Sequence, residues 1–331
     1  MDFSYQGKER NRKVMTELNQ KIVADFKKFK DTAELLQAFP TEQDCIDYLE
    51  YFLWGGKMPT SPFDPTSKVF KCKKRKNWYK CENTNKYFSA KSLTVFRNSK
   101  LPLIKWFQAL HLLLNDPISS HKLIRQVRMT QKTAWFVLHR LRRVFKVPIL
   151  GTMLKGVVEI DEAFLGGSNP NRHWDKKAPK CQGRSWKDKI VVWAAVERGS
   201  GNMVAEISPD TKLSTLEPMA ENSIEKGSTI NSDEWYRNSN LSKNYNHQIV
   251  NHGKGQYAKG KVSVNAVENR WSHLKPMIRG THRGISRKHA QKYIDGFVLR
   301  NNTRNYSIEE KFALILSSSI GKNITYRELI A

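Results

Sequence analysis

The sequence is poor in cysteine, in acidic residues and in long apolar runs. It has 4 Cys among 331 residues, which is too few for a disulfide framework and predicts a reducing, cytoplasmic environment. No window approaches 18 consecutive apolar residues, which argues against a transmembrane helix. The Gly-x-x-x-x-Gly-Lys pattern that cradles phosphates is also absent, so nothing indicates nucleotide hydrolysis.

The shortage of acids leaves a large and uneven positive charge. Lys and Arg number 57 against 31 Asp and Glu, which gives a net charge of +26. Residues 51–150 hold 21 basic and 3 acidic groups, whereas residues 201–250 hold 4 basic and 7 acidic groups. Clustered positive charge on a folded chain is typical of nucleic-acid-binding proteins. We therefore expect a nucleic acid as the partner; the alternative is a basic surface that is merely solvated.

The first hundred residues favour helices followed by a small β module. Residues 1–54 show helical spacing of apolar residues, and Thr41-x-x-Asp44 resembles a capping box that opens a helix. Residues 55–100 begin with a loop rich in Gly and Pro. Short strand-like runs then occur near 69–72, 78–81 and 87–89. This pattern predicts a β module held by its aromatic side chains.

Residues 101–147 predict a helix-turn-helix. A short helix is expected at 119–127, a turn at 128–130 and a further helix from Gln131 to Val144. This arrangement is the shape of a common DNA-reading element. The candidate DNA contacts on the last helix are Lys132, Arg140, Arg142 and Arg143. The alternative is an ordinary basic helical bundle.

From residue 155 to residue 305, strand patterns and helix patterns alternate. This order predicts an α/β domain with a mixed sheet. Strands are expected at 157–164, 189–197, 203–207 and 228–233, and helices at 213–226, 264–278 and 287–300. We assign residues 306–331 to a C-terminal tail.

Three acidic residues occur within or at the ends of these predicted strands and helices. Asp161 lies within an apolar strand, Asp233 ends another strand, and Glu268 lies on a later helix. Hard oxygen ligands without His or Cys suit Mg²⁺ or Mn²⁺, and buried carboxylates without a cation are costly. We predict these three residues as metal ligands. Glu159 shares the strand face of Asp161 and is an alternative ligand, whereas Glu162 on the opposite face is expected to support by hydrogen bonding.

The helix of Glu268 has two neighbouring stripes. Apolar residues from Val264 to Ile278 recur at steps of three and four, which predicts a packed face. Glu268 and Lys275 lie on the adjacent polar stripe, followed by Arg279. We expect Lys275 and Arg279 to meet the DNA backbone. The alternative is a solvated polar face.

Two of these segments resemble a known family. The run Val-Glu-Ile-Asp-Glu-Ala-Phe-Leu-Gly-Gly at 158–167 resembles the first acidic motif of DDE insertion-sequence transposases of the ISXO-like group (the IS fifteen-ninety-five family). Residues 265–275 resemble the third motif of that group, Asn-x-x-Glu-x-x-Trp-Ser-x-x-Lys. There are 34 residues between Asp233 and Glu268, and Lys275 follows seven positions later, in agreement with DDE recombinases.

The resemblance spans about residues 35–305 and implies a function. It implies an RNase H-like catalytic core with Asp161, Asp233, Glu268 and Lys275 as catalytic residues and two Mg²⁺ (or Mn²⁺) ions on the three acids. It also implies a cytoplasmic, nucleoid-associated protein of bacterial type. Such a protein binds terminal inverted repeats in double-stranded DNA, acts as a homo-oligomer, and catalyses strand cleavage and strand transfer. Two alternatives stay open, namely an RNase H-like nuclease without strand transfer and an inactive or domesticated DNA-binding regulator.

The sequence departs from the family in two places. The front module of the family is a zinc ribbon with two Cys-x-x-Cys knuckles, but here the first reads Ser61-Pro62-Phe63-Asp64 and the second keeps only Cys81. A tetrahedral zinc site needs four ligands, so we expect a degenerate zinc-ribbon-like module without structural zinc. In addition, Ser263 stands where the group has His.

Overall fold

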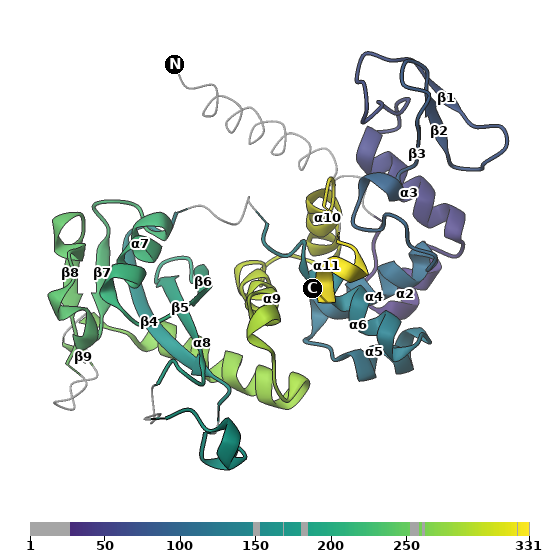
Figure 1. Cartoon of the computed structure of the whole chain (residues 1–331). Helices are drawn as coiled ribbons and strands as arrows, with labels where there is room; N and C mark the ends of the chain where they lie inside the picture. The colour runs from purple at the N-terminus through teal and green to yellow at the C-terminus, as the bar shows by residue number, and fades with distance from the viewer. Residues whose placement is uncertain are drawn as a thin grey trace. The chain divides into compact units, whose positions relative to one another are not determined.

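The computed structural model describes residues 27–147, 153–167, 169–179, 185–251, 258–259, 262–322 and 324–330. The described residues fall into two compact units (Figure 1). Unit 1 combines the N-terminal segment, up to residue 149, with the segment from 305 onwards, and unit 2 spans 150–304. Much of the helix expected before residue 38 lies outside the described residues. Within the described part of the chain, no helix is long and apolar enough to cross a membrane.

Unit 1 is built around a group of aromatic side chains. Its principal helices are α2 (Thr32–Ala38), α3 (Glu42–Trp54), α4 (Leu103–Asn115) and α10 (Ile308–Ser318). The expected capping box is present, since the Thr41 hydroxyl accepts from the Asp44 N–H and the Asp44 carboxylate accepts from the Thr41 N–H. The ring of Phe107 lies 5.1 Å from Phe39 and 5.1 Å from Phe312, in edge contacts. These contacts join three parts of the sequence in one core.

The segment that we assigned to a C-terminal tail contains a core helix. Helix α10 begins with a capping box between Ser307 and Glu310, and its residue Phe312 is fully buried. The helix packs against α3 and α4, and a short helix α11 (Tyr326–Ile330) follows. The tail assignment is corrected on this point, because a capped, mostly apolar segment gains more by burial than by exposure to water.

The β module consists of the three expected strands, which form an antiparallel sheet. They are β1 (Val69–Lys71), β2 (Tyr79–Cys81) and β3 (Tyr87–Phe88), in that order, followed by a short 3-10 helix η1 (Lys91–Leu93). Residues alternate between the two faces of the sheet, so one face buries Tyr79, Cys81 and Phe88. The rings of Tyr79 and Phe88 are 5.8 Å apart. Aromatic packing therefore provides much of the core of this small module.

The two helices expected next to each other are also present. Helices α5 (Ser120–Val127) and α6 (Gln131–Arg142) begin at the side-chain caps Ser119 and Thr130. Arg128, between them, has φ of +52°, which lets the chain turn sharply from one helix into the next. The two expected helices and the turn between them are therefore present, whereas their assignment as a DNA-binding helix-turn-helix remains a prediction.

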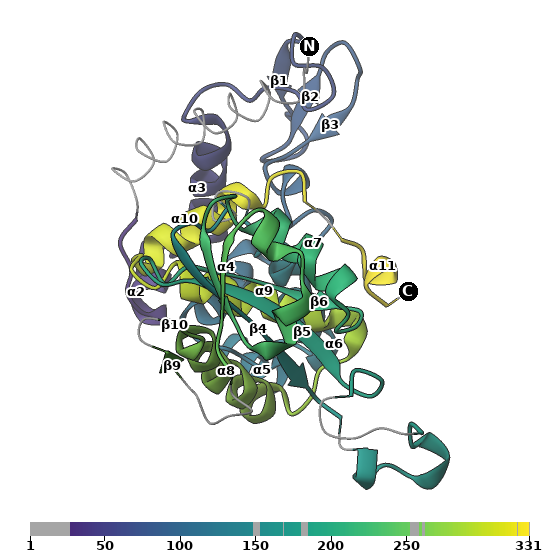
Figure 2. The same ribbon diagram turned by 90° about the vertical axis from the view of Figure 1, so that its left-hand side faces the viewer.

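Unit 2 is a five-stranded mixed sheet in the order β6-β5-β4-β7-β8 (Figures 1 and 2). The strands are β4 (Val157–Leu165), β5 (Ile190–Glu197), β6 (Met203–Ser208), β7 (Thr229–Ser232) and β8 (Asn246–Ile249). Strands β4, β5 and β6 pair antiparallel, whereas β7 runs parallel to β4 and to β8. The predicted α/β class with a mixed sheet is confirmed. The arrangement is compatible with an RNase H-like core.

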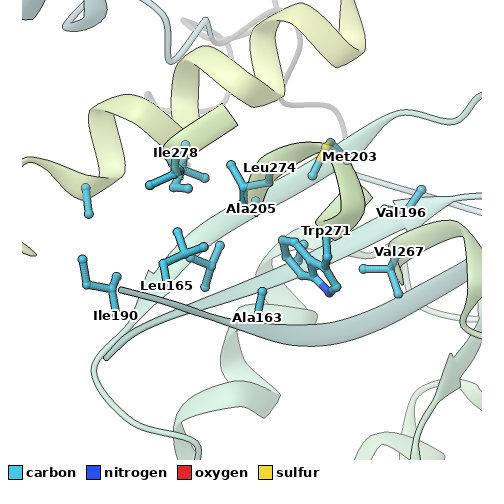
Figure 3. Close-up of a cluster of buried hydrophobic side chains, with 14 of the residues drawn as sticks. Ala163, Leu165, Ile190, Val196, Met203, Ala205, Val267, Trp271, Leu274 and Ile278 are labelled. Atoms are coloured by element: carbon cyan, nitrogen blue, oxygen red, sulfur yellow. The ribbon is translucent and has the colours of Figure 1, made fainter. Parts of the chain in front are cut away.

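Helices cover both faces of this sheet. The longer ones are α7 (Leu213–Ser223), α8 (Asn265–Pro276) and α9 (Ala290–Asn302), and a π-helical segment η8 (Met277–His282) continues α8. One face packs Ala163 and Leu165 against Trp271, Leu274 and other residues of α8, η8 and α9 (Figure 3). The other face packs residues of β4 and β5 against α7. The remaining short elements are η3 (Asn169–Asn171), η4 (Trp174–Lys176), η5 (Glu234–Asn238), η6 (Leu241–Lys243), β9 (Ala258–Lys259), β10 (Val262–Ser263) and η9 (Arg287–His289).

Candidate active site

A cavity of about 790 Å³ in unit 2 is lined by the four residues that we expected to be catalytic. Asp161, Asp233, Glu268 and Lys275 all line it, although they come from a central strand, a strand end and a helix. The other lining residues include Glu162, Lys189 and Trp271. Acids that are far apart in the sequence therefore face one common space.

Sheet register explains why the two aspartates meet. Strands β4 and β7 are parallel neighbours, and Glu159 pairs with Asn231. Two residues further along each strand direction lie Asp161 and Asp233, on the same side of the sheet because strand side chains alternate. Asp233 follows the last residue of β7, and its Oδ1 accepts the N–H of Trp235 at 3.0 Å. This hydrogen bond makes Asp233 the cap of η5.

Asp161 lies in an environment that disfavours its negative charge. The pKa of this carboxyl is raised to about 6, mainly by burial and to a smaller extent by the nearby charges of Asp233 and Glu268. Hydrogen bonds from Trp271 and from the backbone N–H of Glu162 oppose this effect. The indole Nε1 of Trp271 donates to Asp161 Oδ2 at 2.8 Å. Asp233 and Glu268 thus both disfavour the negative charge of Asp161, and a bound cation would relieve this effect.

Glu159 anchors the helix that carries Glu268. Its Oε2 accepts the backbone N–H groups of Ala266 and Val267, at 2.6 and 3.2 Å, in the first turn of α8. Arg198 Nε donates to its other oxygen at 2.5 Å. The side chain of Glu159 is buried, so these bonds compensate for a charge removed from water. Glu159 was the alternative metal ligand, and the structure instead engages its carboxylate with the helix N-terminus and an arginine.

Ser263 belongs to the same network. The guanidinium of Arg198 donates to the backbone carbonyl of Ser263 at 3.2 Å and also to its hydroxyl. That hydroxyl lies 3.4 Å from Glu159 Oε1 and donates to it. The residue found where the family has His therefore helps to hold Glu159 and the start of α8.

Glu162 has the supporting contact that we expected. The hydroxyl of Tyr236, which is fully buried, donates to Glu162 Oε1. Burial raises the pKa of Tyr236 well above its ordinary value, and the charge of Glu162 adds to this effect. The contact ties β4 to η5, the element that follows Asp233, and so stiffens the wall of the cavity.

The chemistry of the donor set fits a hard divalent cation. Three carboxylates line one cavity, and carboxylate oxygens are the ligands that Mg²⁺ and Mn²⁺ prefer. Among the described residues, however, no group of three or more His, Cys, Asp or Glu side chains lies close enough together to hold one ion. The acids share a cavity and interact electrostatically, but they do not form a closed ligand cage.

The candidate DNA contacts divide into exposed and buried residues. Lys132, Arg143, Lys275 and Arg279 are exposed, as a role in DNA binding requires. Arg140 and Arg142 are only 3% and 4% exposed, which corrects their assignment as DNA contacts. Arg140 donates to the carbonyl of Arg97 and lies 5.7 Å from the ring of Trp106. Arg142 donates to the carbonyl of Ile118 at 3.3 Å.

Arg140 and Arg142 are buried because they lie on the face of α6 that packs against the rest of unit 1. Arginine stems are apolar, so the two guanidinium groups can close hydrogen bonds inside unit 1 while their stems fill the core. Three other exposed cations near Lys132 were not singled out from the sequence, namely Lys122, Arg125 and Arg128. The sequence feature that could have predicted them is the strongly polar outer face of the short helix α5. With Lys132 and Arg143 they are the exposed cations of this helix pair and its turn.

Comparisons with known proteins agree with the geometry of unit 2. Residues 153–302 match the family model described as the ISXO2-like transposase domain, a segment that contains Asp161, Asp233, Glu268 and Lys275. A protein of Halobacterium salinarum, described as an uncharacterized protein in transposable element ISH50, is 24% identical over 250 residues. The matched region covers 73% of this chain and 84% of that protein.

Proposed function

Because residues 153–302 match the family model described as the ISXO2-like transposase domain, we propose that this protein is the transposase of an insertion sequence. It binds the terminal inverted repeats of its element and catalyses metal-dependent cleavage and strand transfer in an RNase H-like core. The observation that supports this most directly is the common cavity of Asp161, Asp233 and Glu268, where burial, with a smaller contribution from the two other acids, raises the pKa of Asp161. A cluster of like charges in a transposase domain favours a divalent-metal site.

Each acid has a defined part in this proposal. Asp161, Asp233 and Glu268 would hold two Mg²⁺ or Mn²⁺ ions once their side chains close on them, and the bound ions would activate a water and stabilise the leaving oxygen. The indole of Trp271 fixes the carboxylate of Asp161, and Glu159 fixes the helix on which Glu268 lies. Lys275 contacts a DNA phosphate near the scissile bond, which positions the strand without reading its sequence.

The reaction proceeds in two phosphoryl-transfer steps. Water attacks the phosphodiester at the end of the element and leaves a free 3′-hydroxyl. That hydroxyl then attacks a phosphodiester of the target DNA by in-line displacement, without a covalent enzyme intermediate. Two ends must be held together for this reaction, so we propose a homo-oligomer.

In this proposal, unit 1 binds the DNA ends of the element. The helix pair α5 and α6 offers the exposed cations Lys122, Arg125, Arg128 and Lys132, and Arg143 follows at the end of α6. Lys275 and Arg279 provide further phosphate contacts in unit 2. Such contacts give affinity that falls steeply as the salt concentration rises.

A strand-transfer assay tests the function. The purified protein is incubated with a labelled DNA end from its own element and a target plasmid, with Mg²⁺ or with a chelator. We expect cleaved ends and joined products with Mg²⁺ that disappear with chelator and with Asp161→Asn or Glu268→Gln. The matched control is Glu221→Gln, on the exposed side of α7 away from the cavity, which should keep full activity.

The same assay separates the two alternatives. Cleavage without joined products, under conditions where a pre-cleaved end is also not joined, indicates a nuclease. Specific binding to the ends without cleavage by the wild type indicates a regulator. Full cleavage by Asp161→Asn would contradict the assignment of the site.

A further inference from the structure

The solvent face of the small β sheet presents aromatic rings where a polar surface is expected. Phe70 on β1 pairs directly with Lys80 on β2, and Lys80 pairs with Tyr87 on β3. These three residues therefore form one row across the sheet, on the face opposite to Tyr79 and Phe88. Phe70 is 50% exposed and Tyr87 is 45% exposed. We call this row, together with Arg75 and Trp78, the aromatic face.

Positive charge surrounds the aromatic face. Between residues 68 and 88 the sequence has eight basic residues and one acidic residue. Four of the basic residues are consecutive and exposed in the hairpin between β1 and β2, at positions 73–76. The guanidinium carbon of Arg75 lies 5.7 Å from the ring centre of Trp78 and 5.8 Å from that of Tyr87. These distances are within the range of cation–π attraction, so Arg75 interacts with both rings.

The spacing of the row suits a flexible strand with accessible bases. Phe70 and Tyr87 lie two strand spacings apart, about 10 Å, with the ammonium-bearing side chain of Lys80 between them. Aromatic rings bind nucleic acid by stacking on base faces, and cations between the rings bind the phosphates. The bases of a duplex are already stacked on one another, whereas unpaired bases offer free faces. The row therefore fits a single strand better than a duplex.

We propose that the aromatic face binds single-stranded DNA, with unpaired bases stacked on Phe70 and Tyr87 and with Lys80 and the hairpin cations on the phosphates. The identity of the nucleic acid rests on the proposed function, because a transposase acts at DNA ends where strands separate. The stacking itself depends only on unit 1 and can be measured without cleavage. This surface gives the transposase a site for an unpaired segment that is separate from the acids of unit 2.

Binding of labelled oligothymidylate to the full chain, followed by fluorescence anisotropy at several salt concentrations, tests the proposal. The variant Phe70→Leu/Tyr87→Leu should lose about fivefold to a hundredfold in affinity for each ring removed, with an unchanged slope of log affinity against log salt. Lys80→Gln should instead make that slope shallower by about 0.7. Affinity for a blunt-ended duplex of two complementary strands should change by no more than about twofold in the leucine variant, because paired bases do not stack on the rings.

Two controls separate stacking from folding. The exchange variant Phe70→Tyr/Tyr87→Phe keeps both rings and should bind oligothymidylate as the wild type does. Tyr306→Leu removes a tyrosine that is 44% exposed elsewhere in unit 1 and should leave binding unchanged. Unchanged oligothymidylate affinity in the leucine variant would overturn the proposal, as would an equal loss for the blunt-ended duplex. Cleavage by the wild type is scored in parallel, so that a failure of the transposase function is seen independently of the aromatic face.

Discussion

The carboxylate of Glu159 lies 2.6 Å from the backbone nitrogen of Ala266, which joins the central strand to the first turn of the helix that carries Glu268. An acid at a helix N-terminus interacts favourably with the helix dipole, and here Arg198 also holds it in place. Glu159 is thus a positioning residue that acts on the site through α8.

The first prediction concerns this anchor. Glu159→Ala should destabilise the protein by about 3 kcal/mol, because it removes the acceptor of two backbone N–H groups and of Arg198 Nε. It should also weaken the apparent Mg²⁺ affinity in cleavage, since Glu268 is less well held. Glu159→Gln keeps an oxygen acceptor and should recover part of both losses. Thermal unfolding and a Mg²⁺ titration of the cleavage rate check this, and an unchanged Mg²⁺ dependence in Glu159→Ala would rule out the positioning role.

The second prediction concerns the charge of Asp161. Its pKa is about 6 in the folded protein against 3.8 ordinarily, so between these values the folded state binds more protons than the unfolded state. Stability attributable to this group therefore falls as the pH rises from about 4 to about 6 and stays low above that. At pH 7 with chelator, Asp161→Asn should be more stable than the wild type by up to about 3 kcal/mol. The two should converge near pH 3.

Mg²⁺ provides the complementary measurement. Cations bound between the acids should raise the unfolding temperature of the wild type, and should raise that of Asp161→Asn much less. Glu221→Gln, outside the cavity, should respond to Mg²⁺ as the wild type does. An equal Mg²⁺ response in all three proteins would mean that the acids of the cavity are not the binding site.

Local pattern was enough to predict most of unit 2. The apolar runs around Asp161 and Val192 predicted the paired strands, and the steps of three and four through Trp271 predicted α8. Strand β8 was missed because Asn246 to Gln248 are polar, and only pairing with β7 makes this segment a strand. Pairing partners are tertiary information that a single window of sequence does not contain.

The absence of tertiary information from local sequence also explains which residues of the site could be predicted and which could not. The three acids could be chosen from the sequence because each stands out in its own element. The role of Glu159 could not, because its partners Ala266 and Arg198 come from other elements. The prediction that Arg140 contacts DNA was wrong for a related reason. Which face of a basic helix is buried depends on the elements that pack against it, and these are not visible in the sequence of the helix alone.

The third prediction contrasts a buried and an exposed cation on α6. Arg140→Gln should destabilise unit 1 by about 2 kcal/mol or more, because it removes a hydrogen bond to Arg97 and the packing against Trp106. Lys132→Gln should lower stability by no more than about 1 kcal/mol, through the lost contact with the Tyr326 ring, but should weaken duplex binding with a salt slope shallower by about one. Anisotropy at several salt concentrations and thermal unfolding check both variants. A changed salt slope in Arg140→Gln, at full stability, would show that this arginine meets DNA.

The fourth prediction concerns zinc. Hydroxyl groups of Ser61, Ser67 and Thr84 surround Cys81; burial raises the pKa of the thiol, but their hydrogen bonds outweigh this effect and lower it to about 7. One thiol with three hydroxyls is a poor ligand set for zinc. We expect elemental analysis of the purified chain to find no stoichiometric zinc, and a chelator to leave the unfolding temperature unchanged. One zinc per chain would refute this view of the module.

The module should depend on aromatic packing instead. Phe88→Ala should destabilise it by about 3 kcal/mol or more, because the ring of Phe88 is part of its core.

The fifth prediction isolates the hydrogen bond between Trp271 and Asp161. Trp271→Phe keeps a ring in the core but removes the Nε1–H that stabilises the ionised carboxylate, so the pKa of Asp161 should rise further. Cleavage requires the ionised acid, and the acidic limb of the pH–rate profile should therefore move to higher pH. On that limb, at a fixed pH below both midpoints, the rate should be about tenfold lower for every pH unit that separates the midpoint of the variant from that of the wild type. The control is Trp193→Phe, on the opposite face of the sheet, which should lower stability without moving the limb. A profile of Trp271→Phe that matches the wild type would mean that Asp161 does not set the acidic limb.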